Sequence, residues 1–81
     1  MTRGNMPHLD LHFNPRDLNE ADIAAMADDL RHVLKSHLGT SDDAISMAFT
    51  QVAEENWKAE VYDPIISPAL DKLYKAPGYK L

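Results

Sequence analysis

The chain has 81 residues, contains no cysteine and carries 13 acidic against 8 basic residues, for a net charge of −5. Disulfides are therefore excluded, and scattered basic residues on an acidic protein argue against binding to nucleic acid or to an anionic membrane. No apolar run approaches the roughly 20 residues that cross a bilayer, and Met1–Asn5 is not followed by the apolar segment of a secretory signal. We expect one small cytoplasmic domain that covers part of its apolar surface by self-association.

Two segments alternate apolar and polar residues with the period of a half-buried strand. The first follows Pro7 and runs to Phe13, and the second runs from Ile45 to about Val52. The stretch between them is long enough for a full helix, which a parallel, right-handed crossover requires. A pair of strands leaves both sheet edges unpaired, so we expect a second subunit to continue the sheet.

The stretch between the predicted strands has the clearest pattern in the chain. Apolar residues recur at helical spacing and predict a helix over about residues 20–38. Asn19 is suited to cap its first turn, and Gly39 is suited to a left-handed conformation at its end.

The C-terminal third is less regular. Residues 54–58 are expected to form a loop that carries the only tryptophan, and the apolar spacing of residues 66–74 predicts a second helix. Asp63 and Pro64 are an earlier start signal, and the alternative is a helix that starts there and bends at Pro68. Tyr79–Leu81, after a Pro-Gly turn, is a candidate short edge strand. The expected fold is therefore α+β: two parallel strands, a crossover helix and a second, C-terminal helix.

Five segments occur in an order and spacing typical of one known family. They are Met6–Leu11, the helix after Leu18-Asn19-Glu20, Ala44–Ala48, Glu55-Asn56-Trp57 and Lys75–Tyr79. Together they resemble the 4-oxalocrotonate tautomerase-like family, and most closely its PptA-type bacterial branch. The resemblance implies a β-α-β subunit that assembles into dimers or hexamers. It also implies keto–enol tautomerisation of small 2-oxo acids without a cofactor. We expect a homodimer, because the long C-terminal segment can cover the surface that hexamers use.

The family's base is an amino-terminal proline, and Pro7 matches it in position. A terminal proline has a secondary amine, and burial beside apolar side chains lowers the pKa of such a group toward the working pH. This role requires that residues 1–6, interpreted as a leader ahead of a domain over residues 7–81, be removed. If they are retained, the Pro7 nitrogen is an amide without basicity. The protein is then a catalytically silent oligomeric module of the same fold, in which Pro7 simply opens a strand.

Two further residues are candidates for substrate binding. Trp57 matches an aromatic position of the family and is expected to shield the base and stack on an unsaturated acid; the alternative is a tryptophan buried at a subunit contact. Arg16 follows the first strand, where the family has an arginine for a substrate carboxylate. The alternative for Arg16 is an ordinary exposed loop residue.

One position departs from the family's pattern. Ser46 stands where the founding enzymes have a second arginine, so a double clamp for a dicarboxylate is missing and a phenylpyruvate-like monocarboxylate is favoured. His8, Asp10 and His12 share one face of the first strand and have the residue types of a metal site. We interpret them as the polar face of the strand and expect no metal.

Overall fold

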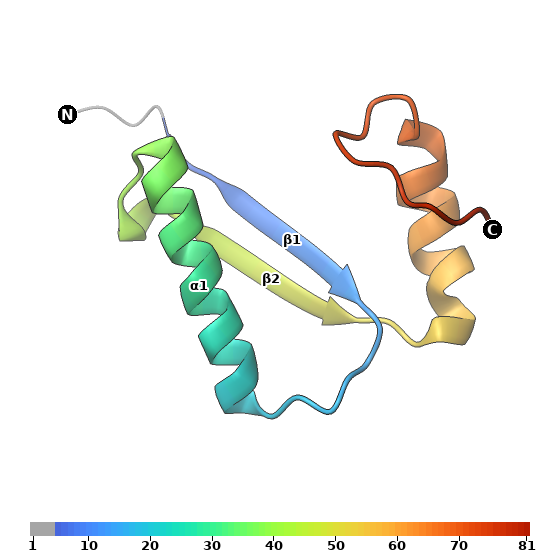
Figure 1. Cartoon of the computed structure of the whole chain (residues 1–81), viewed down its shortest axis with the longest axis horizontal. Helices are drawn as coiled ribbons and strands as arrows, with labels where there is room; N and C mark the ends of the chain where they lie inside the picture. Colours follow the sequence, from blue (N-terminus) through green and yellow to red (C-terminus); the bar gives the residue numbers. More distant parts are fainter. Residues whose placement is uncertain (1–4) are drawn as a thin grey trace. The chain divides into compact units, whose positions relative to one another are not determined.

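The computed structural model describes residues 5–81 (Figure 1). Residues 1–4 of the expected leader lie outside the described residues. The internal contacts divide the chain into two compact units. The first unit runs to Leu11 and then from Arg16 to Thr50, and the second contains His12–Pro15 and Gln51–Leu81.

Strands β1 (His8–Phe13) and β2 (Ser46–Gln51) form a two-stranded sheet. The N–H of Ser46 donates to the carbonyl oxygen of Pro7 at 3.2 Å, and the N–H of Val52 donates to that of Phe13 at 2.9 Å. In both bonds the donor follows the acceptor by 39 residues, and this constant offset is that of parallel strands. The predicted parallel pair is therefore confirmed, and the arrows in Figure 1 point the same way.

Helix α1 (Glu20–Leu38) links the two strands and begins and ends as the sequence predicts. The Asn19 side chain accepts from the N–H of Asp22 at 2.8 Å, and the Asp22 carboxylate accepts from the N–H of Asn19 at 3.1 Å. This reciprocal pair satisfies two amides that the helix leaves unpaired. Gly39 ends the helix at φ 64°, a conformation that glycine adopts without steric cost. Its N–H donates to the carbonyl oxygen of Lys35.

The apolar stripe of α1 is only partly covered in the single chain. No residue of the helix is buried. Val33 is 51% exposed and Leu38 44% exposed, although both belong to the stripe that predicted the helix. The other large apolar side chains of the stripe are half-buried.

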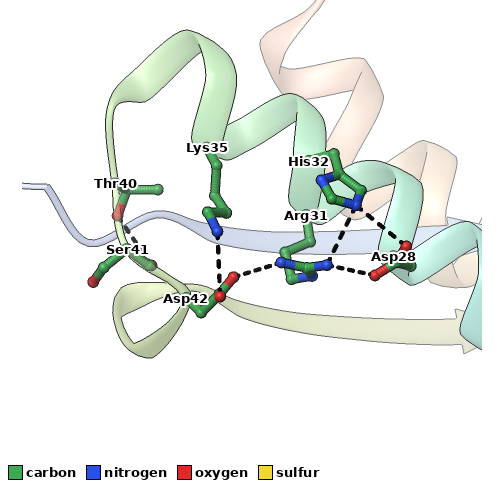
Figure 2. A network of polar contacts seen from close by, with 7 residues as sticks. All are labelled: Asp28, Arg31, His32, Lys35, Thr40, Ser41 and Asp42. Carbon is green, nitrogen blue, oxygen red and sulfur yellow. Dashed lines mark hydrogen bonds and ion pairs between the residues drawn. The ribbon is translucent and has the colours of Figure 1, made fainter.

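A polar network holds the second half of α1 to the turn before β2 (Figure 2). Arg31 donates to Asp28 at 2.6 Å and to Asp42 at 2.7 Å, and Lys35 donates to Asp42 at 3.2 Å. Asp42 opens the short 3-10 turn η1 (Asp42–Ala44). The hydrogen bonds from Arg31 hold the pKa of both carboxyls below the usual value of 3.8, and Lys35 adds to this effect at Asp42.

The second unit differs from the prediction. Helical structure begins at η2 (Glu54–Asn56), where we expected a loop, and continues through η3 (Lys58–Ile66) to η4 (Ser67–Ala69). The predicted C-terminal helix is therefore present with different bounds: helical structure begins well before Asp63-Pro64, and its last element ends at Ala69 instead of reaching Tyr74. Tyr79–Leu81 form no strand.

The reason for this difference is burial. The most buried apolar side chains of the second unit are Val52, Val61 and Tyr62, and two of them lie on η3. The hydrogen bonds of η3 have the wide spacing of a π-helix. For example, the N–H of Ser67 donates to the backbone carbonyl oxygen of Tyr62, five residues earlier. Pro64 and Pro68 have no N–H to donate, which further weakens a regular α-helix here.

Among residues 5–81, no helix has both the length and the apolar character needed to cross a membrane.

Candidate active site

Pro7 lies directly before β1 and is half-buried. Its carbonyl oxygen is held by the N–H of Ser46, so the start of β2 fixes the backbone of this residue. Next to it, His8 Nδ1 lies 2.7 Å from Ser46 Oγ. In the 81-residue chain the Pro7 nitrogen is bonded to Met6 and is an amide.

Asn5, two residues before Pro7, is hydrogen-bonded to the C-terminal end of α1 and to the residue that follows Gly39. The hydroxyl of Thr40, which is 8% exposed, donates to the carbonyl oxygen of Asn5 at 3.0 Å. The Asn5 side-chain amide donates to the carbonyl oxygen of Leu38. The chain that enters Pro7 is therefore hydrogen-bonded to the fold, although Met6 between them is 66% exposed.

Arg16 lies beyond the opposite end of β1, on an exposed loop. The six residues of β1 span about 20 Å at the usual rise of a strand, so Pro7 and Arg16 of one chain are not brought together. No ion pair of the Arg16 guanidinium occurs within residues 5–81. Its charge is accessible to a ligand or to a second copy of the chain.

Trp57 belongs to the second unit and lines a pocket of about 440 Å³ there. This volume lies within the range of small-molecule sites. The pocket walls combine aromatic and aliphatic surface with a few polar groups; they are Asn14, Glu54, Trp57, Lys58, Tyr79 and Leu81.

Hydrogen bonds fix several of these walls. Trp57 Nε1 donates to the phenolic oxygen of Tyr79 at 3.0 Å, and Asn14 Nδ2 donates to the carbonyl oxygen of Val52 at 3.1 Å. Lys58 Nζ lies 2.9 Å from a carboxylate oxygen of Asp63. The pocket therefore offers a fixed indole face, one cation already paired with a carboxylate, and one further carboxylate at Glu54.

Sequence reasoning identified Trp57 but missed the other pocket residues. The sequence predicted the turn at Pro77-Gly78, which indicates that the chain reverses there. No short sequence pattern indicates that Tyr79 contacts Trp57. Lys58 and Glu54 were hidden because residues 54–58 were expected to be a loop. As a helical segment, this stretch places these two side chains one turn apart.

The polar face of β1 does not assemble a metal site. No three histidine or acidic side chains of the described range come together in a way that could hold a metal ion. His8 is instead engaged with Ser46, and Asp10 is exposed.

Two parallel strands joined by a crossover helix, with a proline directly before β1 and a helical segment after β2, define a small α+β protein of the β-α-β tautomerase type.

No family model matches the sequence. The chain is 53% identical over 74 residues to Tautomerase PptA of Pectobacterium carotovorum subsp. carotovorum, covering 91% of this chain and 97% of the relative. It is 45% identical over 76 residues to Tautomerase PptA of Cronobacter sakazakii and 41% identical over 76 residues to that of Escherichia coli O139:H28. In both cases the match covers 94% of this chain and all of the relative.

The chain belongs to the PptA-type tautomerase family. Matches that span nearly the whole of both sequences confirm the expected family and support an isomerase of the tautomerase class.

Proposed function

We propose that this protein is a cofactor-free tautomerase that interconverts the enol and keto forms of a small, phenylpyruvate-like 2-oxo acid. Pro7 is its general base, in a form of the protein from which residues 1–6 have been removed. The observation that carries the proposal is the position of Pro7, directly before β1 in a chain of the tautomerase family.

The reaction needs only a proton transfer. The free secondary amine of Pro7 removes the proton from the enol hydroxyl, and the resulting ammonium returns a proton to carbon 3 of the substrate. One O–H bond is broken and one C–H bond is formed, with no change in oxidation state and no co-reactant. Half-burial of Pro7 supports this role, because partial desolvation disfavours the ammonium and lowers the pKa of an amine.

Self-association to a homodimer would complete the site. Pro7 and Arg16 lie at opposite ends of β1, so one chain cannot present both to one substrate. A two-fold axis normal to the sheet pairs two β1 edges antiparallel and brings the Arg16 end of one strand to the Pro7 end of the other. We infer that Arg16 of a second copy binds the substrate carboxylate, and that Trp57 supplies an aromatic surface for the unsaturated acid.

The substrate is a monocarboxylate in this proposal. Ser46 has no charge to offer a second carboxylate, and its hydroxyl lies 2.7 Å from His8 Nδ1. A single arginine per site matches one carboxylate.

A second candidate is a silent oligomeric module that retains its first residues. The observation in its favour is the contact of Asn5 with Thr40 and Leu38, which holds the acylated form of Pro7 in place. In that form the lone pair of the Pro7 nitrogen is shared with a carbonyl group and takes no proton at neutral pH.

The decisive experiment compares three proteins: the full chain from Met1, a chain that begins at Pro7 after removal of Met6, and the latter with Pro7→Ala. Ketonisation of phenylenolpyruvate is followed by absorbance. We expect activity only in the protein that begins at Pro7, and a loss on the order of 10²-fold or more in the alanine variant, as for other general bases. Equal rates for proline and alanine would remove Pro7 from the mechanism. The intact mass of the protein from its native host shows which form is the working one.

A further inference from the structure

Two contacts hold Tyr79 in place at the wall of the pocket that Trp57 also lines. Its oxygen accepts the hydrogen bond from Trp57 Nε1 at 3.0 Å. Its ring packs against that of Tyr62, with centroids 5.9 Å apart and planes inclined by 43°. Tyr62 is buried on η3, so this contact anchors the phenol to the core of the second unit. Figure 1 shows the C-terminal segment running back alongside the helical segment that carries both partners.

The Trp57 bond leaves the phenolic proton of Tyr79 available. An indole N–H only donates, so Tyr79 is the acceptor in that pair and its own O–H remains free to donate to another group. Within residues 5–81 the Tyr79 hydroxyl makes no second hydrogen bond. It is therefore a donor, fixed in place, on the wall of the pocket.

The other polar groups of the pocket favour a ligand with one carboxylate. Lys58 has three N–H donors and is paired with Asp63 through one contact, so it retains donors for a ligand. The Tyr79 hydroxyl is a second donor beside Lys58, and it carries no charge. Glu54 opposes a ligand with two negative groups.

We propose that Tyr79 is a specificity-determining residue whose hydroxyl donates to a carboxylate oxygen of a planar aryl acid stacked on Trp57. The ligand class rests on the proposed function, whereas the geometry rests only on residues of the second unit. The pocket volume of about 440 Å³ accommodates a single aromatic ring with a short acidic side chain.

The test uses the full 81-residue chain, in which Pro7 is an amide, so that binding is measured without turnover. Cinnamate is the probe, and cinnamyl alcohol is the matched ligand without a carboxylate. Tyr79→Phe keeps the ring against Tyr62 and removes the hydroxyl. Tyr74→Phe is the control, because Tyr74 is fully exposed and lies outside the pocket. Affinities come from titration calorimetry, and quenching of Trp57, the only tryptophan, reports the site.

We expect the Kd of cinnamate to rise about tenfold in Tyr79→Phe, as for loss of a hydrogen bond to a charged group, with less than about a twofold change for cinnamyl alcohol. Tyr74→Phe should bind both ligands like the unchanged protein. Equal weakening of both ligands would mean that Tyr79 only places the C-terminal segment, and would overturn the inference. Unchanged affinity, or no saturable binding by the unchanged protein, would overturn it as well. These outcomes are independent of the Pro7 experiment, which measures turnover in a different form of the chain.

Discussion

Arg31 and Asp42 are joined by a 2.7 Å hydrogen bond between residues that lie on different elements, α1 and η1. The same guanidinium also binds Asp28 at 2.6 Å, so one arginine connects the surface of the helix to the turn that leads into β2 (Figure 2). Strand β2 begins two residues after this turn, and its first residue, Ser46, donates to the carbonyl oxygen of Pro7. The Arg31–Asp42 pair therefore contributes to the placement of Pro7.

The first prediction concerns the pH dependence of this pair. The pKa of Asp42 is lowered by its bonds to Arg31 and Lys35, so its contribution to the free energy of unfolding is present above the unfolded value near 3.8. That contribution is lost as the pH falls through the lower pKa of the folded state. Urea unfolding should therefore show the unchanged protein more stable than Asp42→Asn at pH 7, with a gap that closes below pH 3.8. The control is Asp43→Asn in the same turn; a gap that persists in strong acid would contradict the prediction.

A second prediction links Thr40 to the first residues of the chain. Thr40 is nearly buried and donates to Asn5, so Thr40→Val should destabilise the chain that begins at Met1 by about 1 kcal/mol. In a chain that begins at Pro7 the acceptor is absent, and the same substitution should have a much smaller effect. Urea unfolding of the four proteins measures the difference, with Thr50→Val on the exposed side of β2 as the control. An equal loss in both backgrounds would show that Asn5 does not stabilise the fold.

A third prediction concerns Val33, an exposed apolar residue of α1. If a second copy covers it, Val33→Glu places a charge in an apolar contact and should dissociate the assembly. Sedimentation equilibrium should give about twice the 9.1 kDa mass of the chain for the unchanged protein, and 9.1 kDa for the variant. Ser36→Glu, an exposed residue of the same helix, is the control. A single-chain mass for the unchanged protein would refute the homodimer.

A fourth prediction concerns Arg16 in the chain that begins at Pro7. Arg16→Ala should raise KM for phenylenolpyruvate about tenfold with a smaller effect on kcat, because it removes a charged hydrogen bond to the carboxylate. Arg16→Lys should recover part of the loss, and a methyl ester of the substrate should respond to neither change. The control is Lys72→Ala, an exposed cation of the second unit. Equal effects on acid and ester would assign Arg16 a structural role.

The first two-thirds of the fold could be predicted because its signals are local. Asn19 and Asp22 satisfy each other's amides within one turn, Gly39 relieves the strain of a positive φ, and the apolar spacing of α1 marks its length. The parallel pairing of β1 and β2 follows from the length of the connection between them. Of the candidate site residues, Pro7 and Arg16 were placed at the two ends of β1 by the same strand pattern.

The sequence by itself therefore determined the β-α-β unit, because hydrogen bonds between near neighbours and the period of the apolar residues depend on the local order of the chain. The family followed from the resemblance of five segments in their order and spacing, which the relatives confirm. Only the tertiary structure decided that residues 54–69 are helical, because the burial of Val61 and Tyr62 depends on partners that the local pattern does not reveal. It also decided that Tyr79 reaches Trp57, and that Thr40 reaches Asn5. Such contacts join residues 22 and 35 positions apart, and their free energy depends on the closure of the intervening chain, for which no short segment carries a signal.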